Sequence, residues 1–367
     1  MKNNKDLLPL NYNITEISTE DEKRNNLVSI PNQNTRYIYN ALTNSNNLEL
    51  FKNRANKISK GKAEYRVNGD NTAIIQKTAN AEITLDLGGK ISRPTKNIAL
   101  WIFHKLGLQN IITNLFEDLS IEFPMQDLID LGMYKELKNA YAGFNKAKNE
   151  LTSIKLNAVV KNGKDKDLKK VTNDTTVMFI KAGYSNGTCY IMLNKYINWS
   201  VFSLQSYALI PKVYWKLSPK AQDLLYNIFS YARQQTGLHK ANEITFNMSF
   251  RNIQNILSLP DETATNKPKQ LIITPILEAI EECQKYVDEN KEDFIIIPNY
   301  DKNGNIKAFL DGYLTVTLKG VYASKIIEIA DNKSKIIQYE QAKKERIAEQ
   351  AQAKVLASKI KKDKEKK

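Results

Sequence analysis

The stretch LSPKAQDLLYNIFSYARQQ, Leu217–Gln235, opens the segment on which the interpretation of the whole chain depends. Ser218 is suited to cap the first backbone N–H groups of a helix, and Pro219 is favoured at the first helical position. The apolar residues that follow fall on one face at helical spacing: Leu224, Leu225, Ile228 and Phe229. The stretch therefore predicts an amphipathic helix that packs against a core.

Three further elements follow this helix at short intervals. EITFNM, Glu243–Met248, alternates apolar and polar residues as a half-buried strand does. Ser249 then opens a second helix, FRNIQNILSL, which ends before Pro260. KQLIITPILEAIEECQKYV, Lys269–Val287, predicts a third and longer helix.

Two strand-like runs, DFIIIPNY and IKAFLDGYLTVTL, close the segment at Leu318. The residues between them, DKNGN, contain the Asn-Gly pair that is typical of a hairpin turn. Helix, strand, helix, helix and two-stranded wing is the element order of a winged helix-turn-helix. This fold commonly places its third helix in a DNA major groove.

A second set of elements in the same order lies upstream. It begins with a helix, SRPTKNIALWIFHKLGLQNII (92–112), a short strand, LSIEF (119–123), and a short helix, MQDLIDLG (125–132). A longer Lys- and Asn-rich helix follows, YKELKNAYAGFNKAKNELT (134–152). The strands of a hairpin come last: IKLNAVV and TTVMFIKA, followed by GTCYIMLNKY. The runs Ile121–Met125 and Ile244–Met248 share their apolar positions. We therefore predict an α+β protein built from two tandem winged-helix domains.

The remaining chain flanks these two domains. Residues 1–34 are polar and Asn-rich and are expected to be flexible, with a short docking arm as the alternative. We assign residues 35–198 to the first domain with an N-terminal extension and residues 199–330 to the second domain. Within the extension, a helix is expected at 36–61 and strands at 65–76 and 81–87. Residues 331–367 predict a basic tail, helical or disordered.

Aromatic residues are concentrated between the two domains, where a hydrophilic swinging linker would have few. They are Trp199, Phe202, Tyr207, Tyr214 and Trp215. We expect them to pack the domains against each other or against a partner subunit.

The composition favours a nucleic-acid partner. The chain of 367 residues has a formal net charge of +14, which attracts polyanions. A genomic base bias towards Lys, Asn and Ile codons is an alternative source of this charge. The placement of the charges therefore matters more than their number.

Several classes of site are not supported by the sequence. The two cysteines, Cys189 and Cys283, are isolated from one another and from His104 and His239, so neither a disulfide framework nor a zinc site is expected. No phosphate-loop, metalloprotease or nucleophile-elbow motif is present, and no His-x-His pair serves a metal-dependent tyrosine nucleophile. We expect no enzyme activity and no cofactor. No apolar run is long enough to span a bilayer, so the expected location is the cytoplasm.

The second domain resembles the C-terminal winged helix of the iteron-binding plasmid replication initiators of bacteria. The similarity rests on L217-S-P-K-A-Q-D-L-L-Y226, the strand ITF, the helix I253-Q-N-I-L-S-L259 and P275-I-L-E-A-I280, over about a hundred residues, with a weaker likeness in the first domain. The N-terminal extension and the basic tail depart from the family pattern, which leaves the subfamily open.

The resemblance implies a function and partners. The C-terminal domain would read repeated origin sequences in double-stranded DNA, and the N-terminal domain would mediate dimerisation and touch further DNA. Monomers would open the origin, whereas dimers would repress the gene and contribute to plasmid copy control. The host replication initiator and helicase would be recruited.

In the second domain the candidate DNA-binding residues gather near the third helix. Its start is basic and polar, while its later turns carry Glu278, Glu281 and Glu282, so only the N-terminal end is expected to approach DNA. Gln270 suits an adenine edge and Lys269 a guanine edge. The other candidates here are Lys267, Thr274, the expected phosphate contacts Arg251 and Asn252, and the wing-tip residues Lys302 and Asn303.

In the first domain the candidates lie on the long helix, at the start of the first helix and in the loop KNGKDKDLKK, 161–170, which is expected to be the wing tip. They are Lys135, Lys138, Asn139, Asn145, Lys146, Lys161, Lys164, Arg93 and Lys96. For each lysine taken alone, a solvated helix face is the better explanation, and the hypothesis depends on their joint position.

Two other functions stay open at this stage. One is a winged-helix transcriptional regulator on the same scaffold. The other is a structural or interaction protein of a phage or plasmid whose winged modules bind protein, which predicts weak DNA binding without sequence preference.

Overall fold

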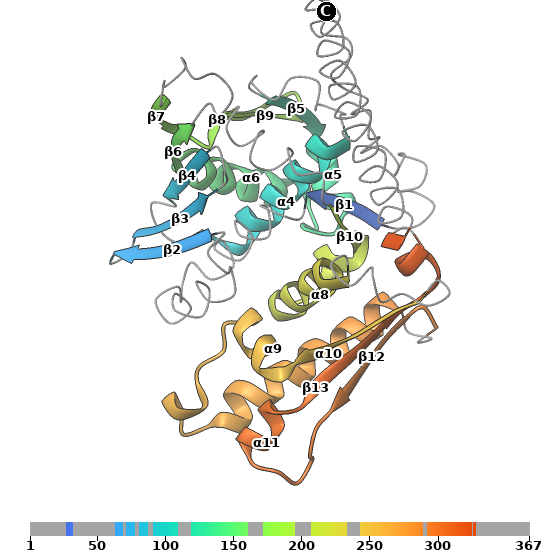
Figure 1. Ribbon diagram of the computed structural model, residues 1–367. Helices are drawn as coiled ribbons and strands as arrows, with labels where there is room; N and C mark the ends of the chain where they lie inside the picture. Colours follow the sequence, from blue (N-terminus) through green and yellow to red (C-terminus); the bar gives the residue numbers. More distant parts are fainter. Residues whose placement is uncertain are drawn as a thin grey trace, which may run out of the picture.

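A computed structural model describes residues 27–31, 63–68, 71–77, 81–86, 91–108, 119–160, 172–194, 207–232, 243–288, 292–324 and 326–327 (Figure 1). Within these ranges the chain is α+β, with two small helical modules that each carry a three-stranded antiparallel sheet. The helix expected at 36–61 and the tail at 331–367 lie outside the described residues. Among the described residues, no helix is both long and apolar enough to cross a membrane.

The second module has the predicted element order. Its elements are α8 (Pro219–Ala232), β11 (Ile244–Ser249), α9 (Phe250–Ile256), the π-helical turn η7 (Lys269–Ile273), α10 (Thr274–Val287), β12 (Phe294–Asn299) and β13 (Tyr313–Leu318). The strands pair antiparallel in the order β11-β13-β12, so the wing strand β13 lies between the other two. Ser249 caps α9, because its hydroxyl accepts a hydrogen bond from the backbone N–H of Asn252 at 3.3 Å. The predicted winged helix is confirmed.

One part of the predicted wing is wrong. The run IKAFL was expected to be strand but forms the short helix α11 (Ile306–Leu310). The side chain of Asn305 caps this helix by accepting from the N–H of Ala308 at 3.0 Å, and Phe309 stacks on Phe250 with ring centroids 4.7 Å apart. Gly312 lets the chain turn back into β13, because a Cβ there would stand 2.5 Å from the carbonyl oxygen of Asn299.

The first module repeats this architecture. It comprises α4 (Arg93–Leu108), β5 (Leu119–Pro124), α5 (Gln126–Asp130), α6 (Leu137–Thr152), β8 (Phe179–Ser185) and β9 (Thr188–Leu193). Its sheet order, β5-β9-β8, corresponds to β11-β13-β12. The apolar positions shared by the two modules are buried in both: Ile121, Phe123 and Met125 in one, Ile244, Phe246 and Met248 in the other. The predicted doubling is confirmed.

The strands that we assigned to the wing of the first module are only partly right. IKLNAVV and TTV form β6 (Lys155–Val160) and β7 (Thr172–Val177), which join a separate five-stranded antiparallel sheet. Its order is β2-β3-β4-β6-β7, with β2 (Ala63–Asn68), β3 (Asn71–Lys77) and β4 (Ala81–Asp86) from the extension. The wing itself is the β8–β9 hairpin, which turns at Asn186 and Gly187, both at positive φ. An inserted hairpin therefore separates the third helix from the wing.

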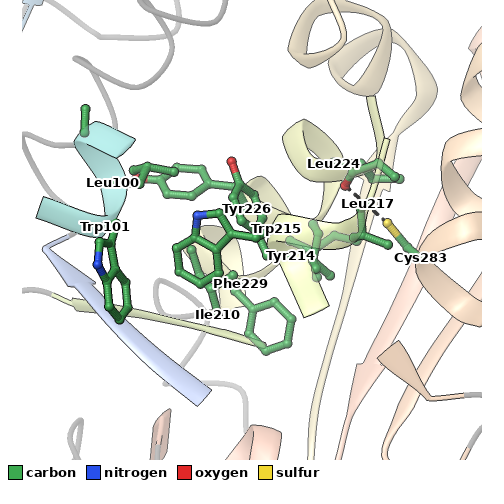
Figure 2. Packing of buried hydrophobic residues seen from close by; sticks show 14 of the residues in the cluster. Leu100, Trp101, Ile210, Tyr214, Trp215, Leu217, Leu224, Tyr226, Phe229 and Cys283 are labelled. Carbon is green, nitrogen blue, oxygen red and sulfur yellow. Dashed lines mark hydrogen bonds between the residues drawn. The ribbon is translucent and has the colours of Figure 1, made fainter. Parts of the chain in front are cut away.

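The described part of the joint between the modules, residues 207–216, forms a strand and a 3-10 helix. Leu27–Pro31 forms strand β1, which pairs antiparallel with β10 (Tyr207–Pro211), so the expectation of a flexible segment is wrong for these five residues. The 3-10 helix η4 (Lys212–Lys216) follows β10 and carries Tyr214 and Trp215, both buried. Trp215 meets Trp101 of α4 edge-on at 5.8 Å, and Figure 2 shows these rings beside Leu100 of α4 and Tyr226 of α8. These two aromatic residues pack the modules together as expected, whereas Trp199 and Phe202 lie outside the described residues.

Candidate nucleic-acid interface

The start of the third helix in the second module is exposed. Ile272 and Ile276 are buried and anchor this part of the chain in the core. The polar side chains that the sequence singled out project from the same turns into solvent: Lys267, Lys269, Gln270 and Thr274. Pro275 has no N–H to bond the carbonyl of Leu271, and the wider π-helical turn Lys269–Ile273 directly precedes it. The start of the third helix, with the two residues before it, therefore presents two basic side chains and one amide to solvent.

Charge is distributed unevenly along this helix. The first turn of α10 has no acidic residue, and the helix dipole adds positive potential at that end. Glu278 and Glu281 are exposed further along the helix. Glu282 is engaged internally, since its carboxylate accepts from the backbone N–H of Ser218 at 2.6 Å and from the Ser218 hydroxyl. A polyanion is therefore attracted to the start of the helix and repelled from its later turns.

The connection between the wing strands lies beside the start of the third helix. Helix α11 contacts the turn η7, and Figure 1 shows both at the end of the module away from α4. Lys302 and Asn303 are exposed on the turn that precedes α11, where the carboxylate of Asp301 accepts from the N–H of Asn303 at 2.9 Å. Lys307, on α11, is exposed at the same end. Our sequence reasoning missed Lys307 because it treated this segment as strand, although the Asn305 cap was a signal for a helix.

Arg251 and Asn252 are half-buried and have partners within the module. The guanidinium of Arg251 donates to Asp311 at 3.0 and 3.2 Å and to Glu262 at 2.9 Å, which ties α9 to the wing and to the loop before η7. These hydrogen bonds to Glu262 and Asp311 raise the pKa of Arg251 above its ordinary value. Asn252 donates to the Tyr231 hydroxyl at 3.1 Å. Internal partners thus engage both side chains, and their role as phosphate contacts stays a prediction.

The long helix of the first module exposes a comparable set of residues. Its buried face is Ala140, Phe144, Ala147 and Leu151. Lys135, Lys138, Asn139 and Lys146 are exposed, and Lys146 lies 3.9 Å from Glu150. Asn145 is half-buried and donates to the hydroxyl of Tyr184 on β8 at 3.2 Å. Four of the five predicted residues near this helix are therefore accessible, and the fifth is held by the wing.

Aromatic side chains on the wing of the first module were missed by the sequence reasoning. Tyr141 of α6 meets Tyr184 of β8 with ring centroids 4.9 Å apart, and Lys181 lies over the ring of Tyr190 at 5.2 Å. The signal was the alternating run around Asn186-Gly187, which we placed behind the wing rather than in it. Lys161 and Lys164, assigned to the wing tip, lie in the β6–β7 connection outside the described residues.

Arg93 and Lys96 hold the two modules together. The carboxylate of Asp223 on α8 accepts from Lys96 Nζ at 2.8 Å and from both terminal nitrogens of Arg93 at 2.7 and 2.9 Å. Lys96 and Asp223 are buried. We call these three residues the Asp223 cluster. Lys96 and Arg93 were predicted to contact DNA. The prediction is wrong for Lys96, because its ammonium is buried. Arg93 points at α8.

Burial and charge oppose each other within the Asp223 cluster. Burial lowers the pKa of Lys96 to about 7, although the Asp223 carboxylate acts in the other direction. Burial also raises the pKa of Asp223, but Lys96 and Arg93 outweigh it and hold the pKa below its ordinary value. The carboxylate is therefore ionised at neutral pH.

Comparisons with known proteins give low similarities. No family model and no curated protein matches the sequence. Among solved structures, the crystal structure of the Pi initiator protein in complex with iteron DNA matches with a TM-score of 0.38 and 15% identity, over 62% of this chain and 90% of that chain. Two structures of RctB domains 2 and 3 match with TM-scores of 0.38 and 0.39 and identities of 11% and 10%, over 71% and 72% of this chain and 95% and 96% of theirs. Similarities this low carry no argument about function, which depends on the residues described above.

Proposed function

We propose that this protein is a sequence-specific double-stranded DNA-binding protein that initiates plasmid replication at repeated origin sites. The observation that carries the proposal is the exposed, acid-free start of the third helix in the second module, formed by Lys267, Lys269, Gln270 and Thr274. In a helix-turn-helix, the N-terminal residues of the recognition helix commonly contact base edges in the major groove, which supports this assignment. The family resemblance of this module supports the replication role.

The proposed contacts divide into base readout and phosphate binding. Gln270 pairs with an adenine edge and Lys269 with a guanine edge once the helix start enters the groove. Lys302 and Lys307, beside that helix start, neutralise phosphates and position the module without reading sequence. The first module adds contacts from the exposed residues of α6, among them Lys138 and Asn139.

The protein acts by binding and recruitment, and it catalyses no reaction. Following the resemblance, monomers bind the direct repeats and open the origin, while dimers repress the gene. The host replication initiator and helicase join the opened DNA.

A binding assay tests the base readout. Lys269→Ala/Gln270→Ala should lose preference for the plasmid's own repeat over a scrambled duplex, while keeping most of its salt-sensitive binding to both. The matched control is Lys285→Ala, which removes one exposed lysine from the far end of the same helix. An unchanged preference in the double variant contradicts the assignment of these residues.

A plasmid that carries only this gene and its flanking repeats tests the replication role. Replication of the plasmid with the wild-type gene, and its loss with the double variant, is the expected result. Sequence-specific binding without replication indicates a transcriptional regulator, and binding without sequence preference indicates a structural interaction protein.

A further inference from the structure

The contact between α4 and α8 is directional. Arg93 donates to the Pro219 carbonyl at 2.7 Å and to Gln222 at 3.3 Å, in addition to its paired bonds with Asp223. The buried Nζ of Lys96 donates to the same Asp223 carboxylate at 2.8 Å. A guanidinium and a carboxylate bond well in only a few mutual orientations. The Asp223 cluster therefore fixes the rotation of one helix against the other, which apolar packing alone does more weakly.

The energetics of a buried ion pair agree with a positioning role. A buried pair contributes little net stability relative to apolar residues of the same volume, whereas leaving one charge without its partner costs about 3–5 kcal/mol. Arrangements of α4 and α8 that separate Lys96 from Asp223 are therefore penalised strongly. The arrangement that satisfies the cluster is selected even though the cluster adds little to overall stability.

Both helices are coupled to the helices that face DNA in the proposed function. Helix α4 packs on α6, and α8 packs on α10. An equivalent hydrogen bond links the two helices of each pair. Glu150 of α6 accepts from the backbone N–H of Ser92, just before α4, at 2.8 Å. Glu282 of α10 accepts from the backbone N–H of Ser218, just before α8, at 2.6 Å. The angle between α4 and α8 therefore sets the angle and distance between α6 and α10.

We propose that the Asp223 cluster is a positioning cluster that fixes the spacing and helical phase of the two DNA segments contacted by the two modules. This inference rests on the proposed function. Each inserted base pair shifts the second segment by about 3.4 Å and about a tenth of a turn around the helix axis. A rigid pair of modules accepts one spacing, whereas a loosened pair accepts several.

Selection from a random pool of duplexes tests this inference with the full chain. The test variant is Lys96→Met/Asp223→Leu, which replaces the buried pair with apolar residues. The matched control is Lys319→Gln/Glu243→Gln, which removes an exposed ion pair of 3.5 Å from the second module and changes net charge equally. Each selected pool is sequenced, and the spacing between the enriched sequence blocks is measured.

The expected result has three parts. The wild type and the control enrich two blocks at one spacing, and the test variant enriches the same blocks at several spacings. Discrimination against a two-base-pair insertion falls from about tenfold or more in the wild type to about threefold or less in the test variant, a loss of at least about 0.7 kcal/mol. A test variant that keeps the single spacing overturns the inference.

The wild-type pool separates failure of the inference from failure of the proposed function. If the wild type enriches no sequence, the proposed function fails and the inference fails with it. If the wild type enriches a single block, the proposed function stands and the inference is overturned.

A distance measurement without DNA gives an independent test. Spin labels on Lys138→Cys and Gln270→Cys report the separation of α6 from the turn before α10. The native Cys189 and Cys283 are buried and stay unlabelled, because burial raises the pKa of each thiol, that of Cys189 to about 12. We expect a narrow distance distribution in the wild type and a broad one in the test variant. Equal distance distributions in the two proteins overturn the inference. If the double variant does not unfold cooperatively, Arg93→Gln is used in its place.

Discussion

Glu282 accepts a hydrogen bond from the backbone N–H of Ser218 at 2.6 Å, and Glu150 makes the same contact with Ser92 in the other module at 2.8 Å. In both cases a carboxylate of the third helix satisfies an N–H at the start of the first helix, where helices leave such donors without partners. The positive end of the helix dipole favours the negative charge. The contact is thus a repeated feature of the two modules and not a coincidence of one loop.

We predict that Glu282→Gln and Glu150→Gln each lower the free energy of unfolding by about 1–2 kcal/mol, because each removes a charged partner from a helix start. Chemical denaturation of the single and double variants measures these losses. The two sites share no partner, so the losses should add to within about 0.5 kcal/mol. Glu278→Gln, on an exposed part of α10, is the control and should leave stability nearly unchanged.

Asp223→Asn should destabilise the protein by about 3–5 kcal/mol, because it leaves the buried ammonium of Lys96 without its carboxylate. Lys96→Met/Asp223→Leu should recover most of that loss, since neither buried charge remains. Urea denaturation of both variants checks the order. If the double variant is less stable than Asp223→Asn, the loss of stability comes mainly from losing the ion pair and not from the unpaired charge.

Acid should reveal the ionisation of Asp223. Its folded pKa lies below the ordinary value of 3.8, so the unfolded chain binds the proton first as the pH falls. The stability that this group contributes is complete above pH 3.8 and is lost as the pH falls from there through the folded pKa. Lys96 stays protonated in both states throughout this range, because even its lowered pKa is about 7.

The measurement compares the wild type with Lys96→Met/Asp223→Leu at pH 5 and pH 3 by urea denaturation. The other carboxyl groups titrate in both proteins, so the wild type should lose more stability than the double variant over this interval. Equal losses would mean that Asp223 has an ordinary pKa in the folded protein.

Lys302→Ala and Lys307→Ala should each weaken DNA binding by a similar factor for every sequence. Each should also lower the slope of log affinity against log salt by about 1, because each removes one phosphate contact. Titrations at several salt concentrations, with the plasmid repeat and with a scrambled duplex, measure both quantities. Lys319→Gln is the control, since Lys319 pairs with Glu243, and it should leave the slope unchanged.

Much of the fold followed from local sequence signals. The helices and first strand of both modules, the shared apolar positions and the Ser249 cap were predicted, because apolar periodicity and capping chemistry are local properties. The exposed start of the third helix in the second module was predicted for the same reason. Its proposed contacts with bases stay predictions.

The errors came from properties that only tertiary structure determines. Lys96 sits on a helix that is buried on several sides, so its spacing gave no sign that it was enclosed against Asp223. Strands β6 and β7 had correct strand character and pair with each other. However, β6 also pairs with β4, some seventy residues upstream at Ala81–Asp86, and sequence pattern does not reveal pairing at that separation. Sequence pattern also did not reveal the partners of Arg251, because Asp311 and Glu262 come from two other segments of the chain.

Strand β1 pairs antiparallel with β10, the strand between the two modules, with Leu27 opposite Pro211 and Pro31 opposite Tyr207. A fragment that begins after Pro31, whether made by protease or by cloning, lacks half of this ladder and leaves the backbone of β10 exposed at the joint. Such a fragment also lacks the contact between β1 and α4, so its modules are joined by fewer contacts than in the full chain. Dissection of the protein should therefore keep these five residues with the rest of the chain.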